Sequence, residues 1–101
     1  MGGGNESGEL DYNYIDMAQL DKLIIRILSG HSDNNIQFSE LTKLLRNFNF
    51  SYRIKGSHHI FWKENIDEII NIQPLGNKAK AYQVKQVRDI LLKYKMIQDE
   101  S

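Results

Sequence analysis

The chain has 101 residues, of which 41% are hydrophobic and 26% are charged, and this is typical of a single small globular domain. It contains no cysteine, which excludes a disulfide scaffold, a thiolate metal site and a cysteine nucleophile. No apolar run approaches the length of a membrane-spanning helix. No hydrophobic leader lies near the N-terminus, so we expect a cytoplasmic protein.

The 13 basic and 13 acidic residues cancel, but they are unevenly distributed. Residues 1–40 hold two basic and seven acidic residues, whereas residues 41–98 hold eleven basic and four acidic residues. Such a basic region in a neutral protein indicates a surface for an anionic partner, of which nucleic acid is the commonest. The alternative is that these lysines and arginines only solvate a helix.

The N-terminal third predicts one helix. Residues 1–10 are rich in glycine and without periodicity, which is typical of a flexible tail. Residues 17–29 have the apolar spacing of an amphipathic helix that ends at Gly30. The apolar positions are Leu20, Leu23, Ile24, Ile27 and Leu28. The polar segment 31–35 is expected to be a loop.

A second helix is predicted to start near Ser39. Serine favours the N-cap position, although Thr42 cannot complete a capping box with it. The expected buried stripe consists of Leu41, Leu44, Leu45 and Phe48. Asn49 is expected to leave the helix.

From Phe50 the hydrophobic period changes to two, which predicts strands. The first strand leads to a turn at Gly56-Ser57, and residues 58–63 return as the second strand of a hairpin. A third strand is expected over about residues 68–73. Pro74 ends it because proline has no N–H for the ladder.

The last predicted element is a helix over about residues 82–95, after a basic loop over residues 75–80 that bends at Gly76 and Asn77. The predicted order is therefore one helix followed by α-β-β-β-α. We expect the α+β class, with a three-stranded antiparallel sheet that carries helices on one face and leaves the other face wet.

Most enzyme classes lack their motifs. There is no helical H-x-x-x-H or H-E-x-x-H pair for a metal ion, and neither glycine segment matches a phosphate-binding P-loop. The adjacent His58 and His59 point to opposite faces of a strand, so they cannot easily share one ion. We therefore expect no metal and no cofactor.

The run KGSHHIF at residues 55–61 remains. Histidine has an unperturbed pKa of about 6.5 and takes or gives a proton near neutral pH. RNA cleavage by its own 2′-hydroxyl needs such a group, together with cations near the phosphate. A histidine beside a glycine, where a backbone can approach closely, suits this role. The alternative is a solvated strand histidine beside a turn.

Residues 38–96 resemble the HicA family of mRNA interferase toxins from type II toxin–antitoxin systems. The resemblance rests on the helix at 39–45, the run at 55–61, the strand at 69–74 and the segment 80–88. Gly-Ser-His after a strand that ends in a basic residue is its most specific short feature.

The resemblance implies a double-stranded-RNA-binding-like fold and a metal-independent endoribonuclease of mRNA, inhibited by a HicB-type antitoxin. In the family a single strand histidine, two or three residues after the glycine of the turn, is catalytic. His58 is therefore the first candidate and His59 the second. The other histidine is either an RNA contact or strand surface.

A set of mostly basic residues is expected to contact the phosphate backbone of RNA. Lys78 and Lys80 precede the last helix, whose first N–H groups favour an anion. Lys85 and Arg88 share one helix face. The full expected set is Arg53, Lys55, Ser57, Lys78, Lys80, Lys85 and Arg88. The alternative is an ordinary solvated surface.

Two aromatic residues near the proposed site are assigned first to packing. The second interpretation of Trp62 is that it stacks on a base of the RNA. The second interpretation of Tyr82 is that its hydroxyl group takes part in the site.

The expected organisation is a flexible tail over residues 1–10, an N-terminal extension over residues 11–35 and the HicA-like domain over residues 36–98. The extension is an addition to the family pattern, and we expect it to pack against the domain. Dimerisation or shaping of the antitoxin contact is its alternative role. The alternative function for the whole chain is a non-catalytic RNA-binding or protein-interaction module of the same fold, because one fold hosts many functions.

Overall fold

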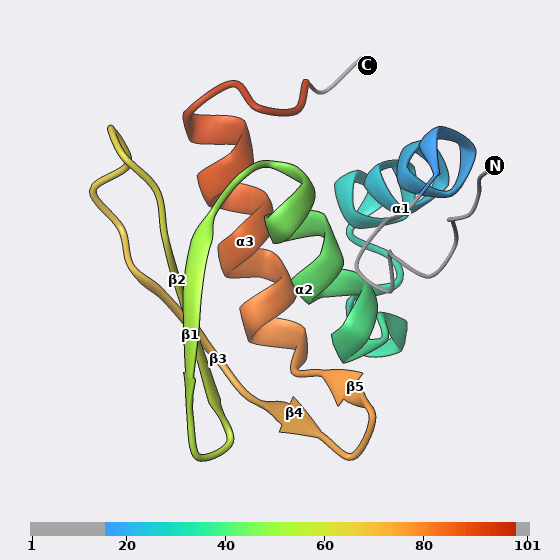
Figure 1. Cartoon of the computed structure of the whole chain (residues 1–101). Helices are drawn as coiled ribbons and strands as arrows, with labels where there is room; N and C mark the ends of the chain where they lie inside the picture. Colours follow the sequence, from blue (N-terminus) through green and yellow to red (C-terminus); the bar gives the residue numbers. More distant parts are fainter. Residues whose placement is uncertain (1–15, 99–101) are drawn as a thin grey trace, which may run out of the picture.

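The computed structural model describes residues 16–98, so the predicted tail over residues 1–10 lies outside the described residues. The sheet forms one layer, helices α2 and α3 form the next, and helix α1 lies on the far side of these two helices from the sheet (Figure 1). The elements are α1 (Met17–Ser29), η2 (Asp33–Asn35), α2 (Phe38–Asn47), β1 (Ser51–Lys55), β2 (His58–Trp62), β3 (Ile70–Ile72), β4 (Pro74–Leu75), β5 (Lys78–Ala79) and α3 (Ala81–Lys93). The predicted α+β class and the predicted order of the main elements are confirmed.

The main sheet has the order β1-β2-β3 with antiparallel neighbours. Because successive side chains on a strand alternate between faces, Phe61, Ile70 and Ile72 lie on the helix-facing side, where they are fully buried. Residues on the opposite face include Arg53 and His58, which are exposed. Helices therefore cover one face only, and we call the uncovered side the open face.

The core lies between the sheet and the helices. Helix α1 contributes Leu23 and Ile27, and helix α3 contributes four fully or nearly fully buried apolar residues. These four are Val84, Val87, Ile90 and Leu91. Burial of this apolar surface is the main stabilising contribution to the fold.

The start of α2 differs from the prediction. The helix begins at Phe38 with Gln37 as its N-cap, so Ser39 lies inside the first turn. The carboxylate of Glu40, at the third helical position, accepts a hydrogen bond from the backbone N–H of Gln37 at 2.9 Å. That bond satisfies a backbone donor at the helix start. It explains why the helix begins at Phe38 with Gln37 as its cap, and not with Ser39 as its cap. Asn49 leaves the helix with φ of +67°, as predicted.

The predicted loop over residues 75–80 is instead a small hairpin. Strands β4 and β5 pair antiparallel around Gly76, whose φ of +64° is readily adopted by glycine. The hairpin is bonded to the chain before α2, because the N–H of Phe38 donates to the carbonyl of Asn77 and the N–H of Ala79 donates to the carbonyl of Ile36, both at 2.9 Å. These long-range bonds hold the start of α3 in place.

Candidate active site on the open face

His58 is the first residue of β2 and is exposed on the open face. The turn before it takes its shape from Gly56, which has a φ of +62° and so favours glycine. The turn, the end of β3 and the start of α3 lie at the same end of the molecule (Figure 1). Two segments that are distant in sequence, the end of β3 and the start of α3, therefore lie near this histidine.

A chain of hydrogen bonds connects Lys80 to His58. The Nζ of Lys80 lies 3.3 Å from the Oε1 of Gln73, the Nε2 of Gln73 lies 3.3 Å from the Nε2 of His58, and the Nδ1 of His58 lies 3.0 Å from the Oδ1 of Asn71. Lysine has only donors, so the Gln73 atom that faces it is the oxygen and the Gln73 amide group donates to His58. His58 therefore accepts at Nε2 and donates its Nδ1 proton to Asn71.

This tautomer decides what His58 is able to do. Its Nε2 is the unprotonated nitrogen, and its lone pair accepts from Gln73 in this structure. The same lone pair is the acceptor that a general base needs, once a substrate hydroxyl takes the place of the Gln73 amide. The carboxamide of Asn71 fixes the orientation of the ring from the other side. The geometry therefore presents His58 as a proton acceptor.

A hollow of about 240 Å³ opens beside this chain, and we call it the His58 hollow. The residues that line it are His58, Asn71, Gln73, Tyr82 and Gln83. Gln83 is 3% exposed, and its Oε1 accepts a hydrogen bond from the backbone N–H of Gln73 at 3.3 Å. A buried side chain held in this way ties the start of α3 to the end of β3.

His59, the second candidate, lies in different surroundings. Its ring contacts Phe38 edge to face, with the ring centroids 4.8 Å apart, and it is half-buried on the helix side of the sheet. Its Nδ1 lies 3.3 Å from the carbonyl oxygen of Ser57. Since His59 does not line the His58 hollow, the structure brings only the first candidate together with the polar residues of that hollow.

Four residues of the expected RNA-binding set lie around His58. Lys55 is its direct cross-strand neighbour, and Arg53 lies further along the same face of β1. Both side chains are exposed. Ser57 is in the exposed turn, and Lys80 reaches His58 through Gln73. The open face therefore joins a histidine to cations of the kind that bind phosphate.

The other three expected residues are engaged elsewhere. Both guanidinium nitrogens Nη1 and Nη2 of Arg88 contact the carboxylate of Asp33, at 2.9 and 3.1 Å, and this arginine side chain is 14% exposed. In this structure its guanidinium group is therefore engaged by Asp33 inside the domain. The Nζ of Lys78 donates to the Oδ1 of Asn35 at 2.8 Å. Lys85 pairs with Asp89 on an exposed helix face.

The sequence reasoning missed Asn71, Gln73 and Gln83. Asn71 and Gln73 alternate with buried Ile70 and Ile72, so their position on the open face is visible in the period of two. Their contact with His58 depends on the register between strands that are far apart in sequence, which periodicity does not provide. The assignment of Tyr82 to packing is also wrong, because the residue is 66% exposed.

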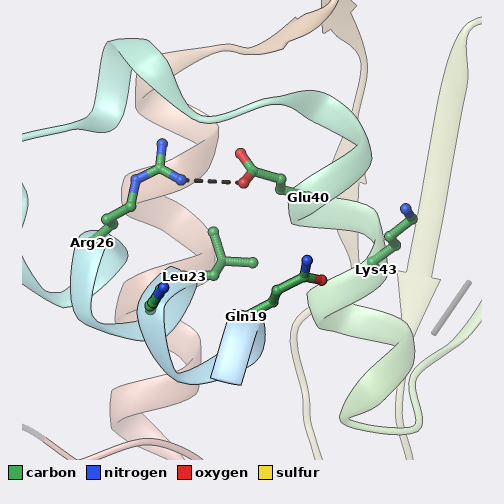
Figure 2. A pocket seen from close by; sticks show the side chains of 6 residues that line it. Gln19, Leu23, Arg26, Glu40 and Lys43 are labelled. Carbon is green, nitrogen blue, oxygen red and sulfur yellow. Dashed lines mark hydrogen bonds and ion pairs between the residues drawn. The ribbon is translucent and has the colours of Figure 1, made fainter. Parts of the chain in front are cut away.

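A second hollow, of about 340 Å³, lies between α1 and α2. Figure 2 shows the ion pair between Arg26 and Glu40 that spans these helices, with 3.1 Å between Nη1 and Oε2. The Nη2 of Arg26 also donates to the carbonyl of Asn35 at 2.7 Å. These contacts attach α1 to the rest of the domain, as expected for the extension, and the lining residues of this hollow include no histidine.

Within residues 16–98, no three histidine or carboxylate side chains are grouped so that they would hold a metal ion. Over the same residues, no helix combines the length and the apolar character needed to cross a membrane.

Comparison of the chain with protein-family models, with curated proteins and with solved structures finds no significant match.

Proposed function

We propose that this chain is a metal-independent endoribonuclease that cleaves mRNA, with His58 as its catalytic residue. The observation that carries the proposal is the environment of His58, an exposed imidazole beside a hollow and next to the cations Lys55 and Arg53. Its Nε2 is the unprotonated nitrogen and is held in the free protein by the amide of Gln73. That combination suits attack by a ribose 2′-hydroxyl, a reaction that uses a base and a positive field and needs no metal ion.

In the proposed reaction the 2′-hydroxyl group of the substrate replaces the Gln73 amide at the Nε2 of His58, and this nitrogen then accepts the 2′-hydroxyl proton. The 2′-oxygen forms a bond to phosphorus while the bond from phosphorus to the 5′-oxygen breaks. Negative charge builds on the phosphate oxygens in the transition state, where Lys55, Lys80 and Arg53 stabilise it. The leaving 5′-oxygen then needs a proton from a second group.

The biological role that we propose is that of the toxin in a HicA-like toxin–antitoxin pair, neutralised by a HicB-type antitoxin. The sequence resemblance over residues 38–96 supports this role, as does the succession α2, β1, β2, β3 and α3 over the same stretch. Expression of the chain is then expected to arrest growth, and production of its antitoxin partner is expected to restore it.

The decisive experiment incubates the purified chain with a long single-stranded RNA in excess EDTA, beside His58→Ala and His59→Ala. We expect the wild type to cleave and His58→Ala to lose activity by about 100-fold or more, the usual contribution of a positioned proton-transfer group. The His59→Ala variant, provided that it folds, should cleave RNA as fast as the wild type. Circular dichroism establishes that each variant has folded.

Three results would contradict the proposal. Cleavage that EDTA abolishes would indicate a metal-dependent enzyme. Full activity in both histidine variants would remove the catalytic assignment. RNA binding without any cleavage by the folded wild type would favour the non-catalytic binding module.

A further inference from the structure

The proposed reaction lacks a donor for the leaving 5′-oxygen. His58 is the base of that step, and its other ring nitrogen directs its proton at Asn71, so the donor is a different group. The side chains that border the same hollow are the first candidates for this acid.

Tyr82 supplies the missing kind of group. The other lining residues of the His58 hollow besides the histidine are Asn71, Gln73 and Gln83, whose carboxamide N–H groups donate hydrogen bonds but do not transfer protons in ordinary acid catalysis. Among the described residues that line this hollow, Tyr82 is the one with an O–H group.

The hydrogen bonding around Tyr82 leaves its proton available. Because the Oε1 of Gln83 accepts from the backbone N–H of Gln73, the Nε2 of Gln83 is the group that donates, at 3.4 Å, to the hydroxyl oxygen of Tyr82. The phenol therefore accepts from Gln83, and its own hydrogen is free to donate to a substrate oxygen. The buried Gln83 acts as a positioning residue for that oxygen.

The exposure of Tyr82 agrees with such a role. Its side chain is 66% exposed, although the apolar face of α3 lies two positions away and begins at Val84. A large ring that is left out of the core contributes little to folding by burial. Its place beside His58 instead gives it access to whatever enters the hollow.

We infer that Tyr82 is the general acid of the proposed ribonuclease and acts in concert with His58 as the base; this inference rests on the proposed function. His58 takes the proton of the 2′-hydroxyl, the 2′-oxygen bonds to phosphorus, and the phosphorus–5′-oxygen bond breaks. The proton of Tyr82 passes to the 5′-oxygen as it leaves. The phenolate of Tyr82 then takes a proton from solvent, and protonated His58 releases its extra proton to solvent.

The test compares two short RNAs that carry one mapped cleavage site. In one the leaving atom is the natural 5′-oxygen, and in the other it is sulfur, which departs as a thiolate without needing a proton. We expect Tyr82→Phe to lower kcat by about 100-fold or more on the oxygen substrate with KM unchanged, and to cleave the sulfur substrate as fast as the wild type. His58→Ala should be slow on both.

Tyr94→Phe is the matched control, because Tyr94 lies at the other end of α3 and donates its hydroxyl to Glu68; it should cleave both substrates like the wild type. The inference is overturned if Tyr82→Phe cleaves the oxygen substrate normally or is equally slow on both substrates. It is also overturned if sulfur rescues Lys80→Met instead of Tyr82→Phe. A folded wild type that cleaves neither RNA would refute the proposed function, and the role of Tyr82 with it.

Discussion

Arg88 is expected from the sequence to contact RNA, whereas in the structure it forms an ion pair with Asp33. Besides its two contacts to Asp33, its Nη1 donates to the carbonyl oxygen of Ile27 at 3.0 Å, at the end of α1. One side chain thus connects α3 to α1 and to the short helix η2, in a place where solvent barely reaches. In this structure the Arg88 guanidinium group therefore links three helices through hydrogen bonds and an ion pair.

We therefore expect Arg88→Met to lower the free energy of unfolding by about 2–3 kcal/mol, since it leaves the carboxylate of Asp33 poorly solvated and without its partner. Urea denaturation measures the difference. Lys85→Met on the same helix removes only an exposed ion pair and should change stability by less than about 1 kcal/mol. Equal effects of the two substitutions would contradict this account of Arg88.

At the scale of elements, Glu68 attaches the segment before β3 to the end of α3. Its carboxylate accepts from the Nζ of Lys93 and from the hydroxyl of Tyr94, both at 2.7 Å. The bond from Lys93, followed by that from Tyr94, lowers the pKa of Glu68 below its ordinary value. In return, the Glu68 carboxylate raises the pKa of Lys93.

The direction of these shifts determines how stability depends on pH. Because the folded-state pKa of Glu68 is lowered, its stabilising contribution is present above the ordinary value and is lost as the pH falls through the lowered pKa. We expect Lys93→Met to move the pKa of Glu68 back toward its ordinary value, as measured by NMR titration of the carboxyl group. Lys95→Met should leave that pKa unchanged, and a Glu68 pKa that ignores the loss of Lys93 would refute the assignment.

At the scale of the whole molecule, a net charge of zero is compatible with RNA binding only if the cations gather on one surface. Arg53 and Lys55 do so on the open face, whereas Lys22 and Lys95 border hollows along α1 on the far side of the domain. The proposed function therefore predicts binding by the sheet side and not by α1.

Salt dependence tests this prediction in a cleavage-inactive His58→Ala background. Each lost contact to a single-stranded phosphate backbone should reduce the slope of log affinity against log salt by about 0.7. We expect the pair Arg53→Gln and Lys55→Gln to reduce the slope by about 1.4, as measured by fluorescence anisotropy. The matched pair Lys22→Gln and Lys95→Gln should leave it unchanged, and the opposite pattern would place the RNA on α1.

Local patterns were sufficient for most of the fold. The apolar spacing over residues 17–29 predicts α1 with the bounds that the structure has. A helix that buries one face has apolar residues every three or four positions, and this spacing is visible in the sequence. The period of two over residues 50–55 and 58–63 predicts β1 and β2, although β1 is exposed at all five positions. The hairpin at β4 and β5 was not predicted, because its strands have only two residues each and show no period. Its further bonds go to Ile36 and Phe38, which lie far away in sequence.

The sequence by itself determined the class of the fold, the turn before His58 and the pair of candidate histidines, because propensity, periodicity and turn chemistry act over a few residues. Tertiary structure alone decided the rest. Strand register set Asn71 and Gln73 beside His58 while His59 packed on Phe38. The stacking of α1 against α3 brought Asp33 from the acidic part of the chain onto Arg88, since opposite charges that lose water on folding require partners.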